Sequence, residues 1–288
     1  MEVPLVSVYI CTYNRSVLLK RAVMSAFDQS YKNVEVVVCS DNSQDDTDLV
    51  MHYLMKTHKN LKYIKNPINS GACVSRNNAI KNCTGDYITG LDDDDYFYPR
   101  RVEAFIENSS LLDKYSFLSS SYYFEDKKHK VRCILNGVEE IDIKKIAKKN
   151  IVGNQIFTLK RRVQDLGGFD EKLPAWQDHE MWLRLISFHG AAYRINEPTY
   201  LIDTSHDHER ISKNINKINV AFEALRAKYN HLYSDTELYA NLKMNVYAYP
   251  ECPFNLYTTL SHIKYRGLYS TCVVLYHKLL KLKSRIMK

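Results

Sequence analysis

The sequence predicts an α/β fold in which a mostly parallel sheet carries helices on both faces, followed by a helical C-terminal extension. Two observations support this prediction. Up to about residue 100, short runs rich in β-branched residues alternate with segments whose apolar residues recur at helical spacing. The strand runs are apolar at nearly every position, which is typical of parallel strands buried on both faces.

The first half of the chain predicts four strands with helices between them. The strands are expected at residues 6–12, 34–39, 61–64 and 86–91. Asn14 is expected to cap the first helix, and the polar run from Asp41 to Asp45 to form a turn and cap the second, at residues 47–55. The Asn69-Ser70-Gly71 segment is expected to open the third helix.

Polar clusters follow three of these strands, at residues 12–15, 41–42 and 92–95. Ligands of open parallel sheets bind at the carboxyl ends of the strands. The topology would therefore bring the three clusters together at one edge of the sheet, although they lie far apart in the sequence.

The second half is less regular. Strands are expected at residues 131–135 and 155–159, a turn at 167–170, and helices at 178–188, 211–229 and 238–247. Met181, Leu185 and Phe188 would share one side of the helix at 178–188.

The run of four aspartates, Asp92 to Asp95, is the sharpest chemical signal. Adjacent carboxylates repel one another, and a hard divalent cation with oxygen ligands is a natural compensation. A solvated acidic loop is the alternative interpretation. We favour a metal site because the run directly follows a buried strand and precedes the aromatic segment at 96–99.

At this point the sequence resembles the family 2 glycosyltransferases, which have the GT-A fold, a Rossmann-like nucleotide-diphospho-sugar transferase architecture. The resemblance covers roughly residues 5 to 210, and the ordered combination of its motifs is far more specific than any one motif alone. The matching segments are VSVYICTYNR (6–15), SDNS (40–43), NSG (69–71), SRN (75–77), GDYI (85–88), LDDDD (91–95), GGFD (167–170) and QDHEMWLRL (177–185).

The resemblance implies that Thr12, Tyr13 and Arg15 line the nucleotide pocket and that Asp41 hydrogen-bonds the uracil. Arg76 would hold the acidic strand end and the phosphates. Each position also has a simpler interpretation. Tyr13 could pack at a strand end, Asp41 could cap a helix, and Arg76 could form a surface ion pair of little energetic value.

The resemblance further implies that Asp92 contacts the ribose, that Asp94 is the ligand of a Mn²⁺ or Mg²⁺ ion, and that Asp93 is the variable residue between them. Asp178 would be the catalytic base of an inverting reaction. The family often has Glu-Asp where this chain has Gln177-Asp178, so the base is retained and its acidic neighbour is not. An N-cap is the simpler interpretation of Asp178.

Three further residues have weaker assignments. Trp176 immediately precedes the Gln-Asp pair and is a candidate acceptor contact, whereas Trp182 is expected in the core. His206 and Arg210 lie where the family folds a loop over the donor diphosphate, so they are candidate diphosphate or metal contacts. An exposed, hydrated loop is the alternative for these two.

The C-terminal segment is strongly basic. The chain has a net charge of +7, yet no acidic residue follows Cys252, while seven Lys or Arg do. Leu268, Leu275 and Leu279 recur at helical spacing, and a stripe of basic residues lies beside them. Such a helix suits an anionic membrane surface, or packing on its own domain or a second subunit with the basic residues solvated. The basic stripe consists of Lys278, Lys281, Arg285 and Lys288.

These observations predict a GT-A domain at residues 1–210, with a nucleotide-binding half (1–100) and an acceptor-binding half (101–210), and a helical basic extension at 211–288. The resemblance to transferases that assemble bacterial surface polysaccharides such as O-antigen implies the activity. We expect transfer of glucose or galactose from a UDP-sugar to a lipid-linked acceptor such as N-acetylglucosamine on undecaprenyl diphosphate. A soluble or protein-linked acceptor is the alternative, and a metal- or sugar-binding module is the non-enzymatic one.

Other classes are disfavoured. The first strand is not followed by the Gly-x-Gly-x-x-Gly of dinucleotide-binding proteins, and nucleic acid is not expected as a partner. The seven scattered cysteines include no Cys-x-x-Cys pair, which favours a reducing compartment. With no signal peptide or apolar span in the sequence, we expect a cytoplasmic protein, peripheral on the inner membrane, and a homodimer is possible.

Overall fold

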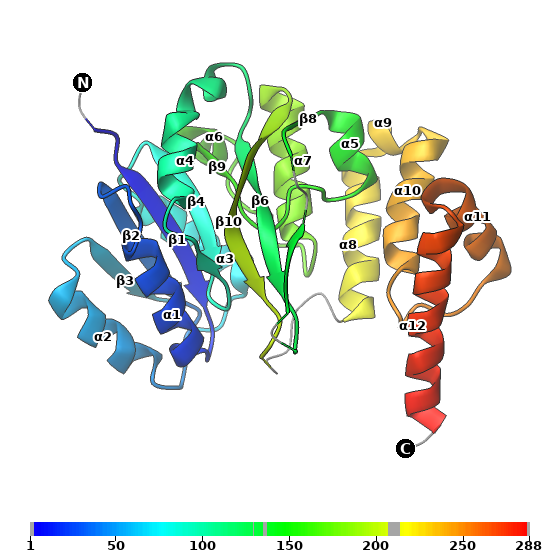
Figure 1. The fold of residues 1–288 in the computed structure, drawn as a ribbon, viewed down its shortest axis with the longest axis horizontal. Coiled ribbons are helices and arrows are strands. Elements are labelled where there is room, and N and C mark those ends of the chain that lie inside the picture. Colours follow the sequence, from blue (N-terminus) through cyan, green and yellow to red (C-terminus); the bar gives the residue numbers. More distant parts are fainter. Residues whose placement is uncertain (1–2, 129, 135–136, 207–213, 287–288) are drawn as a thin grey trace. The chain divides into compact units, whose positions relative to one another are not determined.

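In the computed structural model the chain forms two compact units, a sheet unit and a helical unit (Figure 1). The described residues are 3–128, 130–134, 137–206 and 214–286, with the backbone alone for Ile134 and 281–286. The sheet unit comprises Met1–Ile143, Ile151–Glu171 and Met181–Asp207, and the helical unit comprises Lys144–Asn150, Lys172–Glu180 and His208–Lys288. The domain boundaries expected at residues 100 and 210 stay predictions.

The sheet unit begins with four parallel strands in the spatial order β3-β2-β1-β4. The chain adds strands outward from β1 to β3 and then returns to place β4 on the other side of β1. Because parallel crossovers are right-handed, this reversal puts α3 on the face opposite to α1 and α2 (Figure 1). The elements are β1 (Val6–Thr12), α1 (Ser16–Phe27), β2 (Val34–Ser40), α2 (Thr47–Thr57), β3 (Leu61–Lys65), α3 (Ala72–Asn82) and β4 (Tyr87–Asp92).

The two central strands are buried on both faces, as their continuous apolar sequences predict. Every residue of β2 is buried, and Val8 and Ile10 of β1 are inaccessible to solvent. Leu19 and Val23 of α1 pack in the same core cluster. Burying each such side chain stabilises the folded state by about 1.5–3 kcal/mol. The strands that end in the polar clusters are therefore held in place by the core.

The sheet continues beyond β4 in the order β9-β6-β10-β5, with β7 paired to β6 and β8 paired to β10. The ladder of β6 and β10 is parallel, and the shorter pairings of β5, β7, β8 and β9 are antiparallel. These elements are β5 (Tyr96–Phe97), α4 (Arg101–Glu107), the 3-10 helix η1 (Ser109–Asp113), β6 (Leu118–Glu125), β7 (Val131–Ile134), β8 (Glu139–Ile141), β9 (Phe157–Leu159), α6 (Lys160–Asp165) and β10 (Ala192–Asp203).

The described part of the helical unit consists mainly of helices, and α7 (Gln177–His189) contributes its first residues to it. The side chain of Asp235 caps α10 by accepting hydrogen bonds from the backbone N–H groups of Glu237 and Leu238 at 2.8 and 3.1 Å. The remaining helices are α5 (Ile143–Lys148), α8 (Ile215–Lys228), α9 (Asn230–Tyr233), α10 (Thr236–Tyr247), α11 (Leu256–Arg266) and α12 (Leu268–Ile286). None of the helices in the described part of the chain is long and apolar enough to span a bilayer.

Two local predictions are wrong. Asn14 does not cap α1, because it adopts the left-handed region at φ 53° and its side chain accepts a hydrogen bond from the backbone of Gln44 at 2.7 Å. Phe188 is 70% exposed, although Met181 and Leu185 of the same helix are fully buried. The predicted core position of Trp182 is confirmed.

Candidate functional site

The carboxyl ends of the parallel strands meet at one edge of the sheet. Cys11 of β1 lies opposite Cys39 of β2 on one side and Asp92 of β4 on the other. The Thr12 hydroxyl donates a hydrogen bond to Oδ2 of Asp93 at 2.7 Å. The expected convergence of the polar clusters after β1 and β4 is therefore observed.

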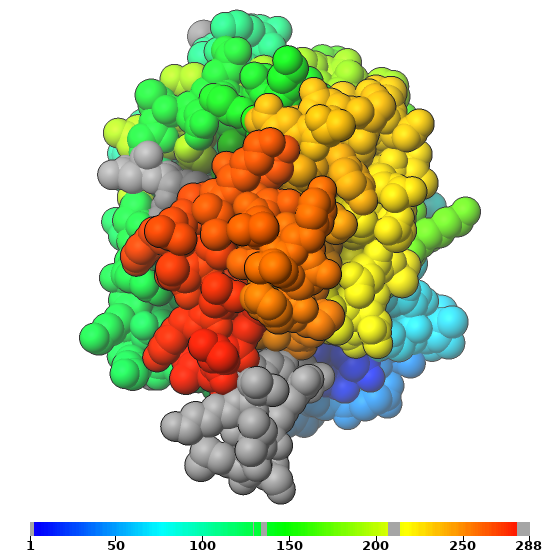
Figure 2. Space-filling model, turned by 90° about the vertical axis from the view of Figure 1, so that its right-hand side faces the viewer, coloured from blue at the N-terminus to red at the C-terminus, as the bar shows by residue number. Residues whose placement is uncertain are grey.

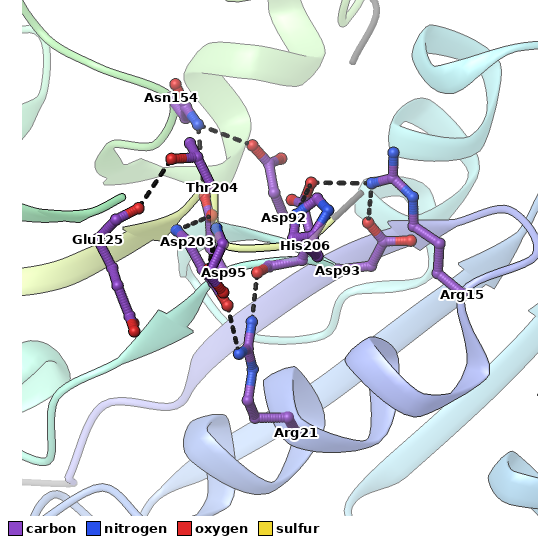
Figure 3. A network of polar contacts seen from close by, with 12 residues as sticks. Arg15, Arg21, Asp92, Asp93, Asp95, Glu125, Asn154, Asp203, Thr204 and His206 are labelled. Atoms are coloured by element: carbon purple, nitrogen blue, oxygen red, sulfur yellow. Dashed lines mark hydrogen bonds and ion pairs between the residues drawn. The ribbon is translucent and has the colours of Figure 1, made fainter. Parts of the chain in front are cut away.

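Asp92 to Asp95 form a tight acidic turn at the end of β4, closed by a hydrogen bond from the backbone N–H of Asp95 to the carbonyl of Asp92 at 3.1 Å. Nη1 of Arg15 lies 2.9 Å from Oδ1 of Asp93 and 3.0 Å from Oδ2 of Asp94 (Figure 3). Burial raises the pKa of Asp93 to about 6, with Arg15 opposing that rise and Asp94 adding to it. Arg15 thus bridges two carboxylates that would otherwise repel each other.

Asp92 is held by two amide side chains that the sequence did not single out. Asn154 donates from Nδ2 to Oδ2 of Asp92 at 3.0 Å, and Gln155 donates from Nε2 to Oδ1 at 2.8 Å. The Tyr9 hydroxyl in turn donates to Oε1 of Gln155 at 3.3 Å, which fixes the orientation of that amide. Asn154 and Gln155 lie just before β9, and only the pairing of β9 with β4 brings them to the acidic turn.

Arg76 approaches the same carboxylate from α3. Its Nη2 lies 3.3 Å from Oδ1 of Asp92, and its guanidinium carbon lies 5.3 Å from the ring centroid of Phe169. Arg76 is only 7% exposed. The alternative of a weak surface ion pair therefore does not describe it, because a buried pair is screened far less than an exposed one.

Asp95 anchors the acidic turn to β10. It is fully buried and accepts hydrogen bonds from the Tyr200 hydroxyl at 2.8 Å and from the backbone N–H of Asp203 at 3.0 Å. Burial and the nearby Asp95 charge raise the pKa of Tyr200 well above its usual value, so Tyr200 remains a hydrogen-bond donor. Beneath it, the buried Arg101 guanidinium lies 4.9 Å from the Tyr200 ring centroid.

Arg21 of α1 makes a second link between these elements (Figure 3). It donates to Oδ2 of Asp203 at 2.5 Å and to the backbone carbonyl of Asp94. Its guanidinium carbon lies 5.1 Å from the ring centroid of Tyr96. The sequence did not identify Arg21 as a site residue, because an arginine on a helix is common and Arg21 belongs to none of the sequence motifs.

His206 lies beside the acidic turn, where its Nε2 is 3.3 Å from Oδ2 of Asp94 (Figure 3). This position is compatible with the expected diphosphate or metal contact. Arg210, the other residue expected in that loop, lies outside the described residues.

Asp41 is buried at the end of β2 and anchors the loop before α3. Its carboxylate accepts hydrogen bonds from the backbone N–H groups of Ser70 and Gly71 at 2.8 and 2.7 Å, and from the Asn66 amide at 3.0 Å. Asp41 therefore does not cap α2 but holds the backbone at the start of α3, whose N-cap residue is Gly71, so its simpler interpretation as a helix cap applies to α3. Tyr13, by contrast, is 46% exposed.

Asp178 and Trp176 belong to the helical unit, whereas the acidic turn belongs to the sheet unit. Asp178 is partly buried in the first turn of α7. Trp176 has a left-handed backbone, at φ 56°, and its indole N–H donates to the Tyr249 hydroxyl at 3.3 Å. A left-handed backbone is rare for a bulky residue and concentrates at functional sites. The facing of Asp94 and Asp178 across one cleft stays a prediction.

Glu180, two positions after Asp178, has a structural role. It is fully buried, accepts a hydrogen bond from the Tyr229 hydroxyl at 2.8 Å, and forms an ion pair with Lys228 at 2.8 Å. These contacts hold α8 against the start of α7 within the helical unit. A removal of Glu180 would therefore cost folding stability before it could inform on chemistry.

The acidic turn has a donor set that suits a divalent cation. Asp92, Asp94 and Asp95 each offer a carboxylate oxygen, and these atoms all lie within 4.8 Å of one another. Hard cations such as Mg²⁺ and Mn²⁺ prefer such oxygen ligands. Asp94 was the expected ligand, and the geometry adds Asp92 and Asp95 as candidates.

Carboxylates and arginines gather at the carboxyl edge of the parallel strands, beside the point where the strand order reverses. Open α/β proteins bind their ligands at this place, and the chain belongs to that class. The chain belongs to glycosyl transferase family 2, whose model matches residues 7–161.

Relatives in this family differ in length. The protein named "Putative colanic acid biosynthesis glycosyl transferase WcaA", from Escherichia coli (strain K12), is 33% identical over 226 residues, which are 77% of this chain and 81% of that protein. An uncharacterized glycosyltransferase of Rickettsia conorii, RC0461, is 28% identical over 81% of this chain but only 39% of its own length. The GalNAc(5)-diNAcBac-PP-undecaprenol beta-1,3-glucosyltransferase of Campylobacter jejuni is 40% identical over 93 residues, 32% of this chain and 30% of that protein.

Solved structures share the GT-A fold. TarS residues 1–349 of S. aureus, in complex with UDP-GlcNAc, has a TM-score of 0.62 at 15% identity, covering 84% of this chain and 80% of that one. The mannosyltransferase PcManGT from Pyrobaculum calidifontis, in complex with GDP-Man and Mn²⁺, has a TM-score of 0.57 at 15% identity, covering 97% of this chain and 81% of that one. The predicted fold class and the predicted family are confirmed.

Proposed function

We propose that this chain is a divalent-metal-dependent, inverting hexosyltransferase. It would move glucose or galactose from a UDP-sugar to a hydroxyl of a lipid-linked glycan, such as N-acetylglucosamine on undecaprenyl diphosphate, during assembly of O-antigen or another surface polysaccharide. The observation that carries the proposal is the acidic turn, in which Arg15 bridges Asp93 and Asp94 at the carboxyl edge of the sheet. The name of the Campylobacter relative, a glucosyltransferase named for an undecaprenol-linked glycan, supports the acceptor class.

The donor nucleotide would bind along the ends of β1 and β2. An ionised carboxylate accepts about four hydrogen bonds, and Asp41 already accepts from two backbone N–H groups and Asn66. It has capacity for one more donor, such as the uracil N–H. Thr12 and the exposed Tyr13 would line the same pocket.

The diphosphate and the ribose would lie over the acidic turn. Arg15 and Arg76 supply positive charge there, and Asp92 would contact a ribose hydroxyl. Asp94, with Asp92 and Asp95 beside it, would hold Mn²⁺ or Mg²⁺. When bound, such an ion neutralises charge that develops on a leaving diphosphate. His206 would add a contact to the diphosphate, and Arg210 is proposed for the same role from its sequence position.

Asp178 would act as the general base of the transfer. Its carboxylate would accept the proton of the acceptor hydroxyl while the acceptor oxygen forms a bond to the anomeric carbon. The bond from that carbon to the diphosphate oxygen breaks on the opposite face, so an α-linked donor gives a β-glycoside. Trp176, beside this base, would contact the acceptor sugar, and the enzyme would work at the cytoplasmic face of the membrane.

The direct test is a donor screen with the full chain. We expect acceptor-dependent release of UDP from UDP-glucose or UDP-galactose with a synthetic lipid-diphosphate-N-acetylglucosamine. Release should be lost in EDTA and restored by Mn²⁺ or Mg²⁺, and NMR of the product should show a β-linkage. Turnover with soluble glycans alone would contradict the acceptor assignment, and an α-linked product would contradict the inverting mechanism.

A further inference from the structure

The helical unit leaves one side of α12 exposed, and the side that packs is not the apolar one. Thr271 is buried, and the Lys278 ammonium donates hydrogen bonds to the backbone carbonyls of Tyr249 and Cys252 at 2.9 and 2.6 Å. The same ammonium lies 4.5 Å from the ring centroid of Tyr247. Lys278 therefore does not belong to a solvated basic stripe, which corrects the sequence-based prediction for this residue.

The opposite side of α12 is apolar and open to solvent. At about 100° per residue, the exposed side chains fall within a single arc of the helix, turned away from Thr271 and Lys278. Tyr269 is 84% exposed, Leu279 63% and Tyr276 59%. The exposed side chains of this arc are Leu268, Tyr269, Cys272, Val273, Tyr276, Leu279 and Leu280.

Helix α11 contacts α12 and adds to this surface. It buries Thr259 and His262 on one side and exposes large apolar residues on the other and in the loop before it. Figure 2 shows the side chains of α11 and α12 next to each other at this face of the unit. The exposed residues are Phe254, Leu256, Tyr257 and Leu260. Exposed apolar side chains gathered in this way on two contacting helices indicate an interaction surface rather than ordinary solvent-facing surface.

The charge of the surrounding segment identifies the kind of partner. Residues 252–288 contain seven Lys or Arg and no Asp or Glu, while the rest of the chain carries 33 of each (40 − 7 and 33 − 0). The whole net charge of +7 therefore resides in the segment that carries the apolar patch. A second copy of the chain would bring two such segments of the same sign together, which is unfavourable. An anionic surface would complement both the charge and the apolar side chains.

We propose that the exposed face of α11 and α12 binds an anionic lipid surface. Tyrosine and leucine side chains suit the boundary between headgroups and acyl chains, and basic residues add attraction to anionic lipids. The face would lie on the bilayer surface. This surface is made entirely by the helical unit and does not depend on the identity of donor or acceptor.

The test is vesicle flotation of the full chain without any sugar substrate. The wild-type chain should bind vesicles of phosphatidylcholine containing about one quarter phosphatidylglycerol at least about tenfold better than pure phosphatidylcholine vesicles. The triple variant Tyr269→Ser, Tyr276→Ser, Leu279→Ser should bind the anionic vesicles about tenfold less tightly, because it removes apolar area from the interface. Lys264→Glu, which reverses one exposed charge on α11, should weaken binding and make the remaining binding less sensitive to salt, because it removes electrostatic attraction to the anionic lipids.

A matched control removes equally exposed apolar residues elsewhere. Leu49, Tyr53 and Phe188 are 61–70% exposed, and their triple serine variant should bind anionic vesicles as the wild type does. Circular dichroism and the melting temperature should show both variants folded. Equal binding by the wild type and the α12 variant would overturn the proposal. So would a dimer that the α12 variant converts to a monomer, since the face would then be a subunit interface. Vesicles carry no acceptor, so either result is independent of the transferase assay.

Discussion

Gln155 donates a hydrogen bond from Nε2 to Oδ1 of Asp92 at 2.8 Å, although the two residues are 63 positions apart in the sequence. The bond forms because β9 pairs with β4 and carries the preceding loop to the end of that strand. With Asn154 on the other carboxylate oxygen, the two amides fix the rotamer of Asp92. The residues that position the acidic turn are therefore two uncharged amides from a distant part of the sequence.

We expect Gln155→Ala to reduce kcat/KM for the donor by about 10- to 100-fold, as is usual for residues that orient a metal or phosphate site. The loss should fall mainly on the donor KM and on the affinity for Mn²⁺, because Asp92 is no longer held in one orientation. Gln164→Ala is the matched control, since Gln164 is an exposed glutamine on α6. Unchanged Mn²⁺ affinity in Gln155→Ala would show that the amide does not position the turn.

Asp41→Asn tests whether that carboxylate recognises the nucleotide or only anchors a loop. The substitution replaces one carboxylate oxygen with an amide N–H₂, which would oppose the backbone N–H of either Ser70 or Gly71. The free energy of unfolding should therefore fall by about 1–3 kcal/mol. If Asp41 also accepts a hydrogen bond from uracil, UDP affinity at a temperature where the variant is folded should fall as well. Denaturation and calorimetric titration measure the two effects separately. Asp86→Asn, at an exposed position, is the control.

The first half of the fold could be predicted because each strand there is a continuous apolar run between turn-forming residues. β6 and β10 could not, although they form the longest parallel ladder of the second half. β6 contains three consecutive serines, and β10 contains Arg194 and Pro198, so neither shows an apolar run or a regular alternation. Their burial comes from tertiary contacts, which override local propensity.

The site divides in the same way. The acidic turn and Arg15 could be predicted because they occur in ordered motifs beside strand ends. Asn154 and Arg21 could not, because an amide in a loop and an arginine on a helix carry no local signal. Their function arises from the register of β9 with β4 and from the packing of α1, which only the three-dimensional fold provides.

Glu35 predicts how the stability of the sheet depends on pH. Burial alone would raise the pKa of Glu35, but hydrogen bonds from Lys62, the Ser7 hydroxyl and the Thr84 backbone lower it to about 2. A carboxylate with a lowered pKa stabilises the folded state above its unfolded pKa, and this contribution is lost as the pH falls toward the folded value. The free energy of unfolding should therefore decline between about pH 5 and pH 2.

Glu35→Gln should flatten this decline and lower the free energy of unfolding at pH 7 by about 1–3 kcal/mol, because a charged acceptor of several hydrogen bonds is lost. Urea denaturation at a series of pH values measures both effects. Glu107→Gln is the control, since Glu107 forms an exposed ion pair with Arg100 and should change stability little. Parallel pH profiles for the wild type and Glu35→Gln would contradict the assignment.

Asp94 and Asp178 are proposed for different steps, and their variants should differ accordingly. Asp94→Asn replaces a carboxylate of the acidic turn with a neutral amide, so Mn²⁺ binding and Mn²⁺-dependent UDP binding should both fall. Asp178→Asn removes a base, so turnover should fall by about 10²–10⁴-fold while UDP and Mn²⁺ affinities stay within a factor of about two of the wild type. Calorimetry for binding and UDP release for turnover separate these outcomes.

The partition between binding and turnover decides the role of Asp178. A general base acts only when the acceptor hydroxyl is attacked, so its loss leaves the donor complex intact. Asp178 also lies in the first turn of α7, where a carboxylate stabilises the helix N-terminus by about 0.3–1 kcal/mol. If Asp178→Asn lowers the melting temperature but keeps nearly full turnover, the carboxylate serves the helix alone and another residue must accept the proton.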